Sequence, residues 1–301
     1  MKTNLSGIFA PICTPFKDGS IAFDQLSYNM KQYRKSRLSG YFVLGSNGEG
    51  PFLAEEEKLG IVELVLDQKA DWQVVMVGAS HESTDQTISF GKKVVTLGAD
   101  YISLLTPSYY KKRYTTEVMV RYYSEVADAL TAPVIIYNAP SFTGTTISSE
   151  VVATLSAHPN IAGMKDTSKG NMSGYISVAN EDFTILSGSI STLFESMMLG
   201  AKGGVVSLAN AFVEPCIDLY EACEAADIQT ARKLHYFLNN LSRAISGRFG
   251  VAGVKFAMEL AGFYGGNPRR PLSPLREAER TCIKTIIDRS GILSSQTNGC
   301  Y

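Results

Sequence analysis

One pattern occurs eight times along the chain: a short run of β-branched and other apolar residues, followed by a segment with helical periodicity. The runs that we expect to be strands are residues 7–13, 40–44, 73–78, 101–105, 134–137, 161–165, 184–187 and 204–207. Helices are expected at 23–37, 55–69, 84–97, 115–130, 148–157, 171–180, 190–199 and 212–225. Because parallel strands need crossover connections, this alternation predicts a parallel sheet.

The number of strand–helix units favours closure into an α/β fold of the (β/α)8 type, a TIM barrel, over an open doubly wound sheet. No GxGxxG segment follows the first expected strand, which argues against a dinucleotide-binding domain. The alternation stops after residue 225, and residues 227–246, 251–262 and 276–290 are expected to form helices only. We therefore predict a catalytic barrel at 1–225 and a C-terminal helical domain at 226–301.

The charge and cysteine content narrows the classes of partner and cofactor. Lys and Arg number 28 and Asp and Glu 29, so no basic field is available for nucleic acid or an anionic membrane. The charge-free span 129–149 contains two prolines, so a membrane helix is not expected. Histidines are too far apart for a zinc site. The odd, scattered set of cysteines (13, 216, 223, 282 and 300) predicts reduced thiols in a cytoplasmic protein.

Lys165 is the most unusual residue at an expected strand end. It closes the apolar run 161–164, so its amine is predicted to point into the mouth of the barrel, where catalytic groups lie in this fold. Desolvation there lowers the pKa of a lysine, and the free amine can form a Schiff base with a ketone. Two alternatives stay open at this stage: the amine extends to solvent, or it pairs with Asp166.

Hydroxyl groups are expected beside this amine. Tyr137 ends the preceding strand, and a phenol can shuttle protons during imine formation and C–C cleavage, although an interior aromatic would explain it equally well. Ser46 lies in a glycine-rich turn at 45–50, whose backbone N–H groups suit a carboxylate. Tyr109 and Tyr110 follow another strand and are either surface aromatics or part of an interface.

The segments at 7–16, 45–50, 137–144 and 163–166 together resemble the pyruvate-dependent class I aldolase family of N-acetylneuraminate lyase and dihydrodipicolinate synthase. The resemblance covers essentially the whole chain. It implies that Lys165 is the Schiff-base lysine and that Tyr137 shuttles protons. It also implies that Ser46 completes a proton relay with Tyr109, which reaches the site of a neighbouring subunit.

The same resemblance implies the remaining properties of the site. The substrate is a small 2-oxo acid, and the residues that it implies for substrate binding are Asn47, Gly48, Phe142, Thr167, Gly188 and Val206. No metal or organic cofactor is expected, since the imine itself accepts the electrons. Members of the family are mostly tetramers built from two tight dimers, so a homotetramer is expected here.

Departures from the family pattern bear on the substrate. Phe142 stands where dihydrodipicolinate synthases carry an arginine that grips a substrate carboxylate, and Ser46-Asn47 replaces the usual Thr-Thr. Segments 45–53, 158–166 and 248–253 instead resemble 4-hydroxy-2-oxoglutarate aldolase, which implies cleavage of that acid to pyruvate and glyoxylate. Alternatives are 2-keto-3-deoxygluconate aldolase, N-acetylneuraminate lyase, a synthase or dehydratase using the same enamine, and a non-catalytic pyruvate-binding regulator.

Overall fold

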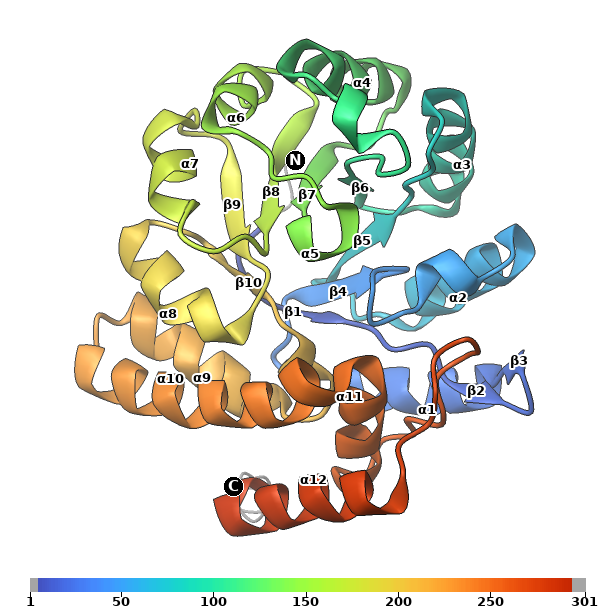
Figure 1. Ribbon diagram of the computed structural model, residues 1–301, viewed down its shortest axis with the longest axis vertical. Coiled ribbons are helices and arrows are strands. Elements are labelled where there is room, and N and C mark those ends of the chain that lie inside the picture. The colour runs from blue at the N-terminus through green and yellow to red at the C-terminus, as the bar shows by residue number, and fades with distance from the viewer. Residues whose placement is uncertain (1–4, 294–301) are drawn as a thin grey trace.

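The computed structural model describes residues 5–293, so Cys300 and the end of the expected C-terminal domain lie outside the described residues. Within this range eight parallel strands close into a barrel with neighbouring order β1-β10-β9-β8-β7-β6-β5-β4 (Figure 1). The strands are β1 (Gly7–Pro11), β4 (Gly40–Val43), β5 (Val74–Gly78), β6 (Tyr101–Leu105), β7 (Val134–Asn138), β8 (Ile161–Asp166), β9 (Thr184–Ser187) and β10 (Gly203–Val205). The predicted TIM barrel is confirmed.

Helices surround the barrel, and their positions follow the periodicity of the sequence closely. They are α1 (Phe23–Tyr33), α2 (Glu55–Gln68), α3 (Thr84–Leu97), α4 (Thr116–Ala129), α6 (Ser149–Leu155), α7 (Met172–Val178), α8 (Ile190–Leu199) and α9 (Val213–Glu224). Local signals set their ends: the Thr115 hydroxyl caps the start of α4, and Gly98 ends α3 with a φ of 104°.

The connections contain short elements that the sequence did not predict. They are the hairpin β2 (Phe16–Lys17) and β3 (Ser20–Ile21), the single-turn helix α5 (Pro140–Thr143), and the 3-10 turns η1 (Gly50–Phe52), η2 (Lys111–Arg113) and η3 (Ser207–Asn210). Elements of two to four residues carry too few positions for a periodicity to show.

The C-terminal region is helical, as predicted, but two of its helices are joined. A π-helical turn, η4 (Arg243–Gly247), runs directly from α10 (Ile228–Ser242) into α11 (Arg248–Leu260), and α12 (Glu277–Ser290) follows. Gly250 departs from helical geometry with a φ of 57°. Helix α10 packs against α8 and α9 of the barrel (Figure 1). The division of the chain into two domains at residue 225 stays a prediction.

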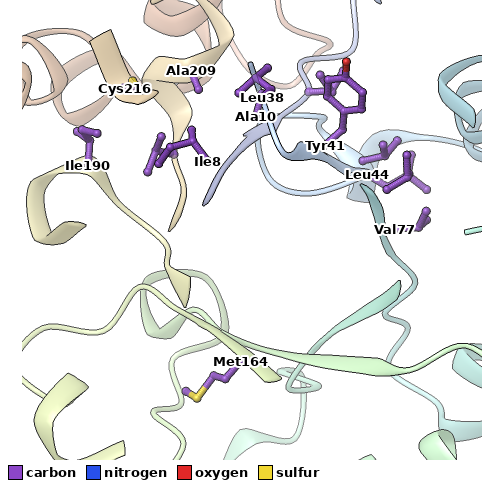
Figure 2. Packing of buried hydrophobic residues seen from close by; sticks show 14 of the residues in the cluster. Ile8, Ala10, Leu38, Tyr41, Leu44, Val77, Met164, Ile190, Ala209 and Cys216 are labelled. Atoms are coloured by element: carbon purple, nitrogen blue, oxygen red, sulfur yellow. The ribbon is translucent and has the colours of Figure 1, made fainter. Parts of the chain in front are cut away.

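Strand residues alternate between two cores. Phe9, Phe42, Ile135 and Leu186 fill the barrel interior with other inward-facing side chains. Their neighbours face outward to the helices, and Figure 2 shows such outward residues, among them Ile8, Tyr41, Val77 and Met164, in the larger buried cluster. This alternation determines which side chain at each strand end faces the inside of the barrel.

The cysteines and other candidate metal ligands of residues 5–293 are scattered, and the helices of this range are short. Cys13, Cys216, Cys223 and Cys282 are free thiols, and burial raises the pKa of Cys13 to about 12. No group of three or more metal-ligating side chains is assembled in this range. None of its helices has the length and apolar character needed to cross a membrane.

Candidate functional site

A cavity of about 550 Å³ lies where the carboxyl ends of the strands meet the C-terminal helices. Its inner part is formed by strand-end residues, among them Ser46, Tyr137 and Lys165. Its outer part includes Ser242, Arg243, Ser246 and Phe249 of the α10–η4–α11 segment. The cavity therefore has the position at which enzymes of this architecture carry their active sites.

Lys165 points into the barrel because Met164, its neighbour on β8, faces outward (Figure 2). Only 5% of Lys165 is exposed. Its Nζ lies 3.9 Å from the centre of the Tyr137 ring and 4.5 Å from that of Phe42. Within residues 5–293 no ion pair joins it to an acidic side chain, and Asp166 instead accepts hydrogen bonds from Asn138 and Ser168. Both alternatives, solvent exposure and pairing with Asp166, are therefore wrong.

The surroundings of Lys165 favour its neutral form. Burial lowers the pKa of the amine below its usual 10.5, while the nearby Tyr137 phenol acts in the opposite direction. Contact with two aromatic faces also favours the cation, but the loss of hydration is the largest effect. A buried amine with a lowered pKa is a nucleophile at a pH where an ordinary lysine is protonated.

Tyr137 is the direct neighbour of Lys165 in the β7–β8 pairing. Its ring packs edge-to-face against Phe42, with 5.6 Å between ring centres. Its hydroxyl oxygen lies 3.4 Å from Ser46 Oγ, at the long end of hydrogen-bond distance. Lysine, phenol and serine hydroxyl thus form a continuous polar group, as the sequence predicted for Lys165, Tyr137 and Ser46.

The turn that carries Ser46 and Asn47 has a constrained backbone. Leu44 and Glu49 both have positive φ values, 61° and 54°, and a Cβ on Gly50 would lie 2.3 Å from the Leu44 carbonyl oxygen. Asn47 lines the cavity and donates from Nδ2 to Ser207 Oγ at 2.8 Å.

Gly48, also expected to bind substrate, does not line the cavity. Its carbonyl oxygen accepts a hydrogen bond of 2.7 Å from the Thr14 hydroxyl, so it helps to hold the turn.

The other expected substrate-binding residues are placed in part as predicted. Phe142, Thr167 and Gly188 line the cavity, and a Cβ on Gly188 would come within 2.3 Å of Thr167 Cγ2. Val206 does not line it. The strand alternation turns Val206 outward into the helix-facing core, and Val205 is the β10 side chain that faces the cavity.

Tyr109 lies outside the cavity of its own chain. Its side chain is 79% exposed and packs edge-to-face on Tyr110, with ring centres 4.9 Å apart. The Glu82 carboxylate accepts hydrogen bonds from the backbone N–H groups of Ser108 and Tyr109, which fixes the loop. An aromatic pair held outward by an anchored loop is typical of a contact with another subunit.

Sequence reasoning missed a buried network behind the catalytic candidates. Asn138 Nδ2 donates to Asp166 Oδ1 at 2.7 Å and lies 3.1 Å from the Tyr175 hydroxyl, whose proton goes to the Ile147 carbonyl. Burial raises the pKa of Asp166, and its hydrogen bonds from Ser168 and Asn138 oppose this. Asn138 directly follows Tyr137, and Asp166 directly follows Lys165. This adjacency is the feature of the sequence from which the network could have been predicted.

A family model described as the dihydrodipicolinate synthetase family matches residues 4–290. This chain belongs to that family. It shares the family-level function of pyruvate-dependent lyase chemistry.

Individual relatives agree with this assignment. The chain is 35% identical to the 4-hydroxy-tetrahydrodipicolinate synthase of Methanosphaerula palustris, over 93% of its own length and 97% of the relative. A dihydrodipicolinate synthase of Acinetobacter baumannii solved with pyruvate superposes with a TM-score of 0.91 at 28% identity, covering 96% and 100% of the two chains. YagE of E. coli K12, also solved with pyruvate, gives 0.89 at 27% identity, covering 96% and 99%.

The comparisons confirm the family but not the finer resemblance to 4-hydroxy-2-oxoglutarate aldolase. Several of the curated relatives are named 4-hydroxy-tetrahydrodipicolinate synthase, a name that gives no support to the aldolase in particular. The comparisons therefore leave the substrate open, and the residues that line the cavity are the remaining guide to it.

Proposed function

We propose that this protein is a class I aldolase that cleaves a 4-hydroxy-2-oxo acid, with 4-hydroxy-2-oxoglutarate as the substrate and pyruvate and glyoxylate as products. The observation that carries the proposal is Lys165, which is buried between two aromatic rings, directly beside the Tyr137 phenol, and has no acidic partner among residues 5–293. No structural role requires an unpaired buried amine, which is unfavourable for folding. Imine chemistry requires one.

The reaction begins when the neutral Lys165 amine attacks the C2 carbonyl. The Tyr137 phenol supplies the proton with which the C2 oxygen leaves as water, which gives a protonated imine and a Tyr137 phenolate. Tyr137, connected through Ser46, removes the proton from the 4-hydroxyl group. The C3–C4 bond then breaks: its electrons form the C2–C3 double bond of an enamine, and the 4-hydroxyl carbon leaves as an aldehyde. Protonation of the enamine at C3 and hydrolysis of the imine release pyruvate and restore the amine.

Ser46 and Asn47 are proposed to bind the pyruvyl carboxylate. Asn47 is oriented by its hydrogen bond to Ser207, and the turn presents backbone N–H groups beside these side chains. Thr167 and Gly188 complete the wall, where the absent side chain of Gly188 leaves room for the substrate.

A panel of hydroxy-oxo acids tests the proposed substrate, with pyruvate release as the readout. We expect the highest kcat/KM with 4-hydroxy-2-oxoglutarate, and lower values with 2-keto-3-deoxygluconate and N-acetylneuraminate. Formation of an imine with pyruvate, with no turnover of any member and no condensation of pyruvate with aspartate semialdehyde, would identify a pyruvate-binding regulator instead.

The second candidate is 4-hydroxy-tetrahydrodipicolinate synthase, which is favoured by the names of the relatives. Phe142 argues against it, because it offers no charge at the position where the resemblance implies a carboxylate-binding arginine. Condensation of pyruvate with aspartate semialdehyde, faster than cleavage of any hydroxy-oxo acid, would establish this candidate and reject the first.

We expect Tyr137→Phe to lower kcat by about 100-fold or more, because it removes a proton-transfer group and keeps the ring. The ring contacts with Phe42 and Lys165 stay, so thermal stability is expected to change little. The measurement is steady-state turnover together with a thermal melt. An unchanged kcat would remove Tyr137 from the mechanism, and a lower melting temperature would point to a structural role.

We also propose that the protein is a homotetramer in which Tyr109 enters the site of a neighbouring subunit. Tyr109→Ala is then expected to lower turnover about 100-fold although the residue lies outside its own chain's cavity. Mixed oligomers of Tyr109→Ala and Lys165→Met chains should regain activity, because some sites combine an intact lysine with an intact tyrosine. Mixtures that stay inactive after subunit exchange would contradict this arrangement.

A further inference from the structure

Apart from the Tyr137 phenol, the ionisable side chains that line the cavity are basic. Among the described residues that line it, the basic ones are Lys165 in the inner part and Arg243 in the outer part, and none is acidic. In the proposed reaction Lys165 becomes a protonated imine once the 2-oxo acid is bound, so the loaded cavity holds two cationic groups, and none of its lining residues is acidic. Such a cavity selects a substrate with two negative charges over a substrate with one. Ser46 and Asn47, near Lys165, account for one carboxylate, so the outer cation is left without an assigned ligand.

Arg243 has no partner in the described part of the chain. Its guanidinium makes neither an ion pair nor a hydrogen bond within residues 5–293. It shares this with other exposed arginines such as Arg232, whereas Arg37 pairs with Glu214, Asp218 and Glu221, and Arg269 pairs with Glu57. What distinguishes Arg243 is that it lines the cavity. A guanidinium presents several N–H donors in a planar fork, which fits a carboxylate with two parallel hydrogen bonds.

Arg243 is an exposed residue in the outer wall of the cavity, in a stretch whose backbone departs from α-helical geometry. Arg243 is the first residue of the π-helical turn η4, and Ser242, Ser246 and Gly247 of the same stretch also line the cavity. Single π turns inside helices occur frequently at functional sites. Hydroxyls of Ser141, Ser191 and Ser273 line the cavity as well, and their side chains donate no hydrogen bond to residues 5–293. Free donors of this kind suit a carboxylate or hydroxyl groups of a substrate.

We propose that Arg243 binds the second carboxylate of a dicarboxylic 2-oxo acid, and that it thereby takes the place of the charge that Phe142 does not supply. The inference rests on the proposed function, because it assigns the distal end of the same substrate. It restricts the substrate class to five-carbon or similar 2-oxo acids with a carboxylate at the far end. It also assigns a specificity role to the C-terminal helical segment.

Binding of two five-carbon acids tests this without any cleavage. 2-Oxoglutarate and 2-oxopentanoate share the 2-oxo acid end and lack the 4-hydroxyl, and only the first has a distal carboxylate. For Arg243→Met, calorimetric titration is expected to show about 30-fold weaker binding of 2-oxoglutarate and at most about a threefold change for 2-oxopentanoate. Arg243→Lys should recover part of the loss, since it keeps the charge and loses the fork.

Arg232→Met is the matched control, because Arg232 is an exposed arginine of α10 that does not line the cavity. It should leave both affinities unchanged, which separates a local contact from a general loss of positive charge. Equal weakening of both acids by Arg243→Met, no weakening of either, or no preference for 2-oxoglutarate in the wild type would each overturn the proposal. If binding follows the prediction but no hydroxy-oxo acid is cleaved, the proposed aldolase activity fails and the carboxylate site stands.

Discussion

Lys165→Met abolishes turnover: we expect a residual kcat of about 10⁻⁴ of the wild-type value or less, because without the amine no imine and no electron sink can form. Methionine is the appropriate substitution because it fills a similar volume between Tyr137 and Phe42. The measurement is pyruvate release from a hydroxy-oxo acid at enzyme concentrations high enough to detect the residual rate. Activity within about tenfold of the wild type would exclude Lys165 as the nucleophile.

The same substitution is expected to stabilise the fold near neutral pH, by on the order of 1 kcal/mol, as is common when a buried functional group is removed. The pKa of Lys165 is lower in the folded chain than its usual 10.5, so the unfolded chain binds more protons between these two values. Wild-type stability therefore rises with pH through this window, and the advantage of the variant shrinks as pH approaches 10.5. Urea unfolding at pH 7 and pH 10 measures this difference, and a variant less stable at pH 7 would instead show that the lysine supports the fold.

Lys255→Met is expected to lower the free energy of unfolding by about 3–5 kcal/mol, because it leaves the carboxylate of Glu49 buried without its cation. The side chains of Lys255 and Glu49 are 0% and 1% exposed, and Nζ donates to Glu49 Oε1 at 2.5 Å. Glu49 also accepts a 2.8 Å hydrogen bond from the Arg269 backbone N–H. The pair therefore ties the turn that carries Ser46 to α11 and the segment that follows it. The measurement is urea unfolding at pH 7.

A solvent-exposed ion pair provides the control. Lys93 pairs with Glu55, and these side chains are 48% and 43% exposed, so Lys93→Met should change the free energy of unfolding by less than about 1 kcal/mol. Adding Glu49→Gln to Lys255→Met should recover part of the loss, since the buried charge is then removed. A loss below about 1 kcal/mol for Lys255→Met would mean that water or a rearranged neighbour compensates Glu49.

Strand positions and the inner part of the site could be predicted from the sequence, because both follow from local patterns. The run before Lys165 identified a strand, and the end of a parallel strand is where this fold places chemistry. Tyr137 was predicted beside Lys165 because consecutive strands of such a barrel are neighbours. The prediction for β10 was wrong by one residue, and the alternation of side chains along the strand explains why. Val205, not Val206, faces inward. The sequence placed the start of this strand at 204 instead of 203, and a strand start that is uncertain by one residue does not determine which of two consecutive valines faces the barrel interior.

The outer part of the site could not be predicted, because it depends on contacts between distant segments. Arg243 lies after the last barrel helix in the sequence, and only the packing of α10 against α8 and α9 brings it to the cavity. Periodicity predicted an interruption between 246 and 251 but not the π turn that joins the helices. Similarly, the structural role of the Gly48 carbonyl depends on Thr14, 34 residues earlier in the chain.

Borohydride reduction in the presence of pyruvate tests the central claim most directly, since it converts an imine into a stable secondary amine that mass spectrometry can locate. We expect one modified lysine per chain, located by peptide mapping at Lys165, with loss of activity in proportion to the modification. Lys165→Met should give no adduct under the same conditions. An adduct at a different lysine, or none in a wild-type protein that turns over substrate, would contradict the assignment of Lys165 as the Schiff-base residue.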